Sequence, residues 1–235
     1  MQGVPLQFSD EKDRARFRHL EQLPGVELYH AHISRYAFEP HTHEAFGIGV
    51  IEQGAERFLY RGSQHIAAAN SIVTMNPDEL HTGEAETADG WRYRMIYLEP
   101  DRLEAITGVR DWWFSEVVRE DPLRSRQIGQ LIYGLWHSDD PLAQQGLLLD
   151  LIDAFRPLAH HASAQGEAGH RFDRVRDYLH DNYMRPITLD ELAQVAALSP
   201  YHFQRQFKAH YHVTPHQMLM AIRLWRAKAF LTHGM

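Results

Sequence analysis

The spacing of apolar residues changes near residue 100, and this change constrains the architecture more than any other feature of the sequence. Between residues 27 and 99, short apolar runs are separated by turn signals such as Gln53-Gly54 and Asn76-Pro77-Asp78. Strands this short, spaced roughly 8–12 residues apart, are typical of a sandwich or barrel. From about Pro100 the apolar residues recur every three or four positions, which is the helical period. The sequence therefore predicts an α+β fold in which a β-barrel precedes helices.

The 235 residues divide into four segments on this pattern. We expect a barrel over 1–100, a helical region over 101–161, a linker over 162–169 and an all-α subdomain over 170–235. The linker prediction rests on composition, because ASAQGEAG is small, polar and contains glycine. The length is sufficient for two domains.

Composition excludes several kinds of site. The chain has no cysteine, which excludes disulfides, thiolate zinc sites and a cysteine nucleophile. No segment approaches the roughly 20 apolar residues that cross a bilayer, and the N-terminus lacks the pattern of a signal peptide. We therefore expect a cytoplasmic protein without a membrane partner.

Charge is distributed unevenly along the chain. The segment 170–235 carries nine Lys and Arg against five Asp and Glu, a net charge of +4 in a chain whose total is −7. Such asymmetry indicates two modules with different partners, although solvated helix faces also produce it.

Two capped helices separated by a tight turn are predicted within the basic segment. Thr188 stands three residues before Glu191, which is the spacing of a capping box. Ser199 is a second N-cap, and Pro200 occupies the first helical position that proline favours. This arrangement indicates a helix-turn-helix.

The second of these helices has an apolar face and a polar face. Phe203 and Phe207 lie four residues apart and are expected in the core. The opposite face carries Tyr201, Gln204, Arg205 and Lys208. Arginine donates two hydrogen bonds to guanine, glutamine pairs with adenine, and lysine neutralises phosphate, so this face suits a DNA groove. An ordinary solvated face is the alternative that the pattern leaves open.

The segment 172–231 closely resembles the first helix-turn-helix half of the AraC/XylS family of transcription regulators. The resemblance lies in the run S-P-Y-H-F-Q-R-Q-F-K, the V-T-P that follows it and the later R-L-x-x-A-K-x-F-L. It implies a regulator whose partner is promoter DNA, with the positions of Tyr201, Gln204 and Arg205 facing the major groove.

The sequence departs from the family pattern in two places. His212 replaces the glycine that usually precedes V-T-P, so this turn either adopts a left-handed conformation at some cost or changes its form. The family module has two helix-turn-helix halves, and Met235 falls inside or just after the helix that joins them. Because the second half, about 50 further residues, supplies half of the phosphate contacts, we expect weak DNA affinity from this truncated module.

The region 27–100 resembles the cupin-like sensor barrel found in front of many such regulators. The matching stretches are P-H-T-H-E (40–44), I-E-Q-G (51–54), M-N-P-D-E-L-H (75–81) and G-W-R-Y-R-M-I-Y-L-E-P (90–100). The resemblance implies a small-molecule effector bound inside the barrel.

Three histidines raise the question of a metal. His41 and His43 are two residues apart and point to the same side of a strand, and a facing strand can bring in His81. Three imidazoles with open positions form a workable zinc, iron or nickel site. The corresponding function is a cupin metalloenzyme, a dioxygenase or isomerase.

Departures from the metal-binding cupin pattern argue against that alternative. Gly47 and Ile48 stand where such cupins carry a carboxylate, and Asn70-Ser71 replaces a glycine-bearing turn. We therefore expect no metal, no other cofactor and no catalytic residue, with the three histidines lining a ligand site or hydrogen-bonded in the core.

Alternation in the last barrel strand defines the rest of the expected ligand site. Trp91, Tyr93 and Met95 share one side with Tyr97. An aromatic side of this kind suits a small polar or aromatic effector, and an ordinary core-facing side is the alternative.

The helices over 122–161 carry stripes of Leu and Ile, which we interpret as a homodimer surface; packing on their own barrel is the alternative. Together these features predict a ligand-responsive, sequence-specific DNA-binding regulator. The remaining alternative is a sensing module that no longer binds DNA.

Overall fold

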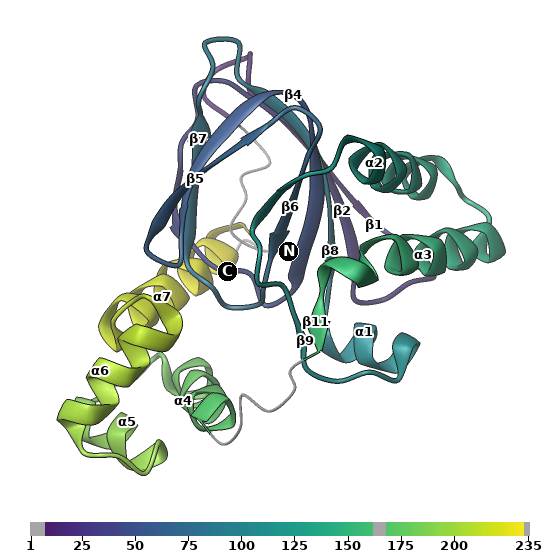
Figure 1. The fold of residues 1–235 in the computed structure, drawn as a ribbon. Coiled ribbons are helices and arrows are strands. Elements are labelled where there is room, and N and C mark those ends of the chain that lie inside the picture. Colours follow the sequence, from purple (N-terminus) through teal and green to yellow (C-terminus); the bar gives the residue numbers. More distant parts are fainter. Residues whose placement is uncertain (1–7, 162–167, 233–235) are drawn as a thin grey trace.

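A computed structural model describes residues 8–161 and 168–232, which form an antiparallel barrel with helices on two sides (Figure 1). The barrel strands are β1 (Arg14–His19), β2 (Val26–Ile33), β3 (Phe38–His41), β4 (Phe46–Tyr60), β5 (Ser63–Ala68), β6 (Ser71–Met75), β7 (His81–Ala85), β8 (Trp91–Leu98) and β10 (Val118–Glu120). This sheet-rich part followed by helices confirms the predicted α+β class.

Strand β4 joins the two layers of the barrel. One layer has the order β1-β2-β8-β4-β6-β10, and in the other β4 pairs with β5 and β7, which in turn pairs with β3. Residues 46–54 of β4 pair with β8, whereas residues 55–60 pair with β5. The strand therefore leaves one layer and enters the other near Gly54.

A bulge at this crossing reverses the alternation of β4. The register with β8 shifts between Ile51 and Gln53, and Gly54 has φ +71° with its missing Cβ position 1.9 Å from the carbonyl oxygen of Gly90. Only glycine fits there, because a side chain would collide with backbone. Ile51 belongs to the interior core before the bulge and Phe58 after it, so the inward residues change from odd to even numbers.

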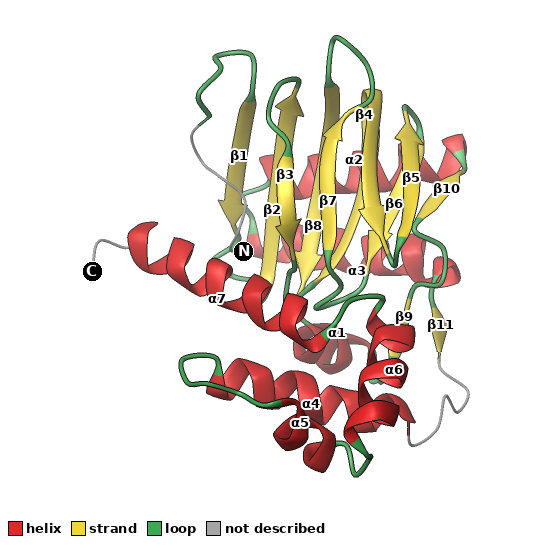
Figure 2. Ribbon diagram, turned by 90° about the vertical axis from the view of Figure 1, so that its left-hand side faces the viewer, coloured by secondary structure: helices red, strands yellow, loops and turns green. Residues whose placement is uncertain are grey.

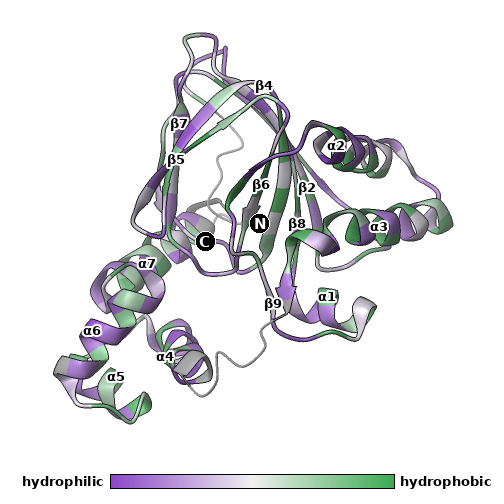
Figure 3. Ribbon diagram, viewed as in Figure 1, coloured by the Kyte–Doolittle hydropathy of each residue, from purple (hydrophilic) through white to green (hydrophobic). Residues whose placement is uncertain are grey.

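Two separate cores stabilise the two faces of the main layer. Tyr93 and Met95 of β8 belong to the barrel interior, while Ile96 and Leu98 pack in a second core beneath the helices. The helices over that second core are α1 (Pro100–Thr107), α2 (Pro122–His137) and α3 (Pro141–Phe155). Figure 3 shows hydrophobic segments in the strands beside α2 and α3.

The region 101–161 is less helical than its period indicates. β10 pairs with β6 of the barrel, and β9 (Trp112–Trp113) pairs with β11 (His160–His161). The helical region predicted over 101–161 does not continue as α-helix beyond Phe155, where α3 gives way to the 3-10 turn η1 (Arg156–Leu158). Pro157 has no N–H to donate to the preceding turn, so the α-helix ends there.

The C-terminal subdomain has its own core and lies at one end of the barrel (Figure 2). Its helices are α4 (Ala168–Asn182), α5 (Leu189–Val195), α6 (Pro200–Tyr211) and α7 (Pro215–Thr232). Of the expected linker, 162–167 lies outside the described residues, whereas Ala168 already begins α4. Figure 2 shows α7 running across the ends of the barrel strands, with α4 beyond it.

The helix caps follow the sequence closely. Thr188 Oγ1 accepts a hydrogen bond from the Glu191 amide at 3.2 Å, and Ser199 Oγ accepts one from the His202 amide at 3.4 Å. His212 ends α6 with φ 59°, so it adopts the left-handed conformation itself. The predicted caps are confirmed, and the turn keeps its form at a conformational cost.

We predict that His212→Gly raises the free energy of unfolding by about 0.5–1 kcal/mol, because glycine adopts a positive φ without steric penalty. Ala209→Gly, at an exposed position inside α6, is the matched control and should lower it by about 1 kcal/mol. Urea denaturation followed by circular dichroism measures both, and a stability loss in His212→Gly would contradict the prediction.

Candidate functional site

The orientation of α6 is fixed by its two phenylalanines. Phe203 and Phe207 are fully buried, and their ring centroids lie 6.3 and 5.9 Å from that of Phe172 on α4. Gln204 and Arg205 are exposed on the other side of the helix. The aromatic contacts therefore determine which face of α6 meets solvent.

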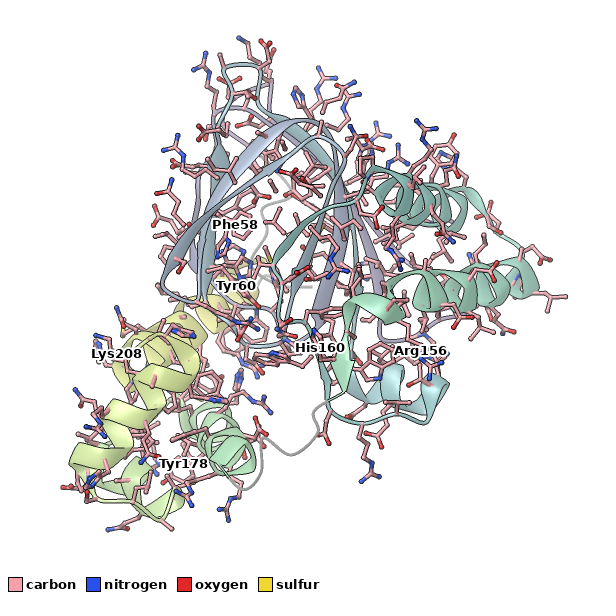
Figure 4. The ribbon with its side chains drawn as sticks, viewed as in Figure 1. Phe58, Tyr60, Arg156, His160, Tyr178 and Lys208 are labelled. Atoms are coloured by element: carbon pink, nitrogen blue, oxygen red, sulfur yellow. The ribbon has the colours of Figure 1, made fainter. Side chains whose placement is uncertain are left out.

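The exposed face of α6 carries positive side chains that have no acidic partner among the described residues. In the described part of the chain, neither Arg205 nor Lys208 forms an ion pair, whereas Arg57, Arg61 and Arg94 of the barrel each do. Figure 4 shows Lys208 at the outer edge of the helical subdomain. Tyr201 lies in the first turn of α6, but its side chain lies outside what the structure describes. Such a face is suited to phosphate and base contacts.

The three histidines come together at the end of the barrel nearest the helical subdomain. His41 ends β3 directly opposite His81 at the start of β7, and His43 follows in the loop. The ring centroids are 4.3 Å apart for His41 and His81, and 4.9 and 5.0 Å from these two to His43. One nitrogen from each ring lies within 4.8 Å of the other two.

Backbone carbonyls set the tautomers of two of these rings. His41 Nδ1 lies 2.7 Å from the Glu39 carbonyl oxygen, and His81 Nδ1 lies 2.9 Å from that of Glu79. A carbonyl only accepts, so both Nδ1 atoms carry the proton and both Nε2 atoms keep a lone pair. Burial lowers the pKa of His41 to about 3, with His81 adding to the effect, and lowers that of His81 to about 4. Both rings are neutral near pH 7.

The cavity that these rings line is small. Its volume is about 30 Å³, close to that of one water molecule in the liquid. Tyr93 and Met95 line it with the histidines, as the sequence predicts, but Trp91 does not. Trp91 is fully buried and stacks on Tyr93 with centroids 5.6 Å apart. In this conformation the space between these side chains is enough for an ion or a water molecule.

Glu56 lines the same cavity, and the sequence analysis missed it. Its side chain is buried in β4 among Phe38, Tyr93 and Tyr97, and burial raises its pKa to about 8. Strict alternation from the first half of β4 places residue 56 outside the barrel, and the bulge turns it inward. The flanking Gln53-Gly54 pair is the only sequence signal for that reversal.

Polar contacts connect the loop that carries His43 and the loop that leads into His81, here called the histidine loops, to the helical subdomain. Asp78 lies 3.2 Å from Arg176 and 3.4 Å from His180, both on α4. Glu44 lies 3.3 Å from His180 and 3.7 Å from Arg226 of α7. The Asp78 amide also donates to the His43 carbonyl at 2.7 Å. The residues that hold α4 and α7 against the barrel are thus next to the histidines in the chain or bonded to them.

No helix in 8–161 or 168–232 combines the length and apolar character that a membrane span requires.

Two family models match most of the chain. Residues 23–152 match the AraC-like ligand binding domain. Residues 179–220 match the bacterial regulatory helix-turn-helix proteins of the AraC family. The first match alone spans more than half of the sequence.

Individual relatives agree with these matches. The chain is 25% identical over 222 residues to the HTH-type transcriptional regulator YbfI of Bacillus subtilis (strain 168), covering 87% of this chain and 80% of that one. It is 21% identical over 209 residues to the HTH-type transcriptional activator RhaS of Enterobacter sp. (strain 638), covering 84% and 75%.

A solved structure shows the same fold. ToxT of Vibrio cholerae strain SCE256, determined with a bound unsaturated fatty acid, superposes with a TM-score of 0.62 over 89% of this chain and 81% of that one, at 8% identity.

We predict that the stabilising effect of Glu56→Gln grows with pH. The folded protein holds the Glu56 proton up to about pH 8, whereas the unfolded chain releases it near the ordinary value of 4.5. As the pH rises between these values, the free energy of unfolding of the parent therefore falls by up to about 1.4 kcal/mol per pH unit. Glu56→Gln has no proton to release at this position, so its stability does not fall for this reason.

Denaturant titrations at pH 5, 6.5 and 8 measure this difference. Glu84→Gln, an exposed neighbour on β7, is the control and should show a difference from the parent that stays constant with pH. A constant difference for Glu56→Gln as well would show that Glu56 is ionised in the folded state.

Proposed function

The chain belongs to the AraC family of bacterial transcriptional regulators, and from this premise we propose that α6 reads bases at a promoter while the histidine cavity senses the effector. It is a ligand-responsive, sequence-specific DNA-binding regulator. The observation that carries the assignment of α6 is its division into a buried phenylalanine face and an exposed, uncompensated cationic face.

The chemistry of the exposed face supports base reading. Arg205 can donate two hydrogen bonds to the O6 and N7 atoms of guanine, and Gln204 can pair with the N6 and N7 atoms of adenine. Lys208, one turn further along, supplies a phosphate contact, and Tyr201 occupies the matching family position at the start of the helix. The helix therefore combines specific and nonspecific contacts on one stripe.

Contacts between the barrel and α4 supply a route for the signal. An effector regulates only if it binds two arrangements of the protein with different affinity. Asp78 and Glu44, which hold α4 and α7, belong to the loops that carry the histidines. A ligand that moves these loops changes how firmly the DNA-reading subdomain is held. The effector site we propose comprises His41, His43, His81, Tyr93 and Met95, with Trp91 behind Tyr93.

The alternatives are less well supported. The matched families contain transcription regulators, which favours this function over a cupin dioxygenase or isomerase, and we assign no catalytic step to the protein. A sensing module without DNA binding has no need of an uncompensated basic face on α6.

We also propose that the protein is a homodimer through α3. Leu142 and Leu149 are 78% and 52% exposed and lie seven residues apart on one face of α3. Gly146 lies between them with open space around its Cβ position. A stripe of two leucines around a glycine allows a second copy of the helix to approach closely.

We predict that Arg205→Ala weakens binding to a specific promoter site by about 1–3 kcal/mol and reduces discrimination at one base pair. Lys208→Ala should weaken binding to all sequences alike and lower the salt dependence. Mobility-shift titrations on the gene's own upstream region, at two salt concentrations, measure both effects.

Arg174→Ala, which removes an exposed arginine from α4, is the charge-matched control and should leave discrimination unchanged. If Arg205→Ala and Arg174→Ala have the same salt-dependent effect, α6 does not read bases.

We predict that Leu149→Glu weakens dimerisation at least about tenfold, because a carboxylate would be buried in the α3 interface. Analytical ultracentrifugation over a concentration series measures it. Leu123→Glu on α2, where the leucine is 83% exposed off this stripe, is the control; equal effects from both variants would place the dimer contact elsewhere.

A further inference from the structure

The geometry of the histidine cavity points to one class of effector, and we propose that His41, His43 and His81 bind a divalent transition-metal ion whose arrival loosens α7 from the barrel. The proposal that a metal binds depends only on the geometry of the cavity. The step from binding to signalling rests on the regulator function proposed above.

In two of the three rings, the nitrogen that would bind the metal already carries no proton. Hydrogen bonds to the Glu39 and Glu79 carbonyls hold the protons of His41 and His81 on Nδ1, which leaves Nε2 of each ring as a ligand. Metal-binding histidines characteristically donate their other N–H to a carbonyl or carboxylate in this way. Two rings oriented by backbone beside a third, buried ring form a preorganised set of ligands.

The size of the cavity selects the ligand. A volume of about 30 Å³ accommodates an ion with one water molecule. Sugars, amino acids and aromatic acids would require Tyr93 and Met95 to leave the positions in which they pack. A metal ion requires no such displacement of Tyr93 and Met95.

The donor chemistry selects the ion. Imidazole suits zinc, nickel, cobalt and copper, whereas magnesium and calcium prefer oxygen ligands. The carboxylate that Gly47 and Ile48 replace is not essential, because three histidines with an open fourth position are a complete zinc set. The sequence predicts no metal because this carboxylate is absent; our proposal departs from that expectation, since the three histidines alone can hold the ion.

Binding should pull the histidine loops together. Zinc holds imidazole nitrogens at about 2.1 Å, which in a tetrahedral site places them about 3.4 Å from one another. The ligand atoms here lie within 4.8 Å of one another, so binding shortens their separations by up to about 1.4 Å. His43 is followed directly by Glu44, and its carbonyl is bonded to Asp78. The contraction therefore displaces the two carboxylates that hold α4 and α7.

The charge of the ion acts in the same direction. Lys228 lies on α7 two residues beyond Arg226, which is 3.7 Å from Glu44 beside the histidines, and its charge acts on His41. Two positive charges added at the cavity repel that ammonium group. Metal binding and docking of α7 consequently oppose each other, and by linkage any change that weakens one strengthens the other.

Metal titration of the full chain without an affinity tag tests the site. Cobalt(II) should give one equivalent with the intense visible absorption of a four-coordinate site, and zinc should displace it. His81→Gln and His41→Asn should each lose this absorption, with circular dichroism confirming the fold. His216→Asn, which removes an exposed histidine of α7, should keep it.

Two results would overturn the site. One is the absence of a stoichiometric cobalt spectrum in the parent. The other is retention of that spectrum in folded His81→Gln, which would show that surface histidines bind the metal.

Lys228→Met tests the coupling. Without the ammonium group, zinc affinity measured by competition with a chromophoric chelator should rise about fivefold. Lys12→Met, an identical charge change in a groove formed with Arg14 and His32, should leave the affinity unchanged. Equal effects in both variants would show a general charge effect, and no effect in Lys228→Met would refute the coupling to α7.

A promoter-binding assay with and without zinc separates the two proposals. Unchanged DNA binding by a protein that takes up zinc would refute the ion as effector and leave the metal site in place. Absence of specific DNA binding under both conditions would refute the proposed function. Specific DNA binding by a chain that takes up no metal would refute this inference alone.

Discussion

The burial of Phe203 and Phe207 against Phe172 is the contact on which the functional arrangement depends. It turns Gln204 and Arg205 outward, and it joins α6 to α4 within one core. The same α4 carries Arg176 and His180, which meet Asp78 of the barrel. Packing and polar contacts therefore run without interruption from the histidine loops to the exposed face of α6. These contacts transmit a signal only if ligand binding at the histidines changes the free energy of the contacts that Asp78 makes with Arg176 and His180.

Local chemistry determines the elements that the sequence predicts correctly. Thr188 and Ser199 cap their helices as expected because capping depends on a few neighbouring residues. The sequence predicts that His41 and His81 meet because they belong to paired strands, whereas His43 joins them from the loop that follows β3. The exposure of Gln204 and Arg205 follows from the position of the phenylalanines, since helical geometry links the two faces.

Features that depend on distant parts of the chain are not predictable in the same way. Glu56 enters the barrel because a bulge at Gly54 fits against Gly90, which lies 36 residues away in the sequence. The small cavity results from the packing of Tyr93 and Met95 against neighbouring strands, and alternation alone gives only the side on which these residues lie. The ion pair between Asp78 and Arg176 joins two domains, and charge patterns do not specify such partners. The sequence pattern thus predicts which residues belong to the site, whereas tertiary packing determines the volume of the cavity and its contacts with the helical subdomain.

Site-specific cross-linking tests the central claim, that this face of α6 lies against bases, most directly. The chain has no cysteine, so Gln204→Cys introduces a single attachment point for a short photoactivatable cross-linker. We predict adducts at one or two bases of the specific site, read in the major groove, and no adduct from a cross-linker attached at Arg174→Cys on α4. Adducts from position 174 with none from position 204 would show that another surface binds the DNA, and would contradict the account.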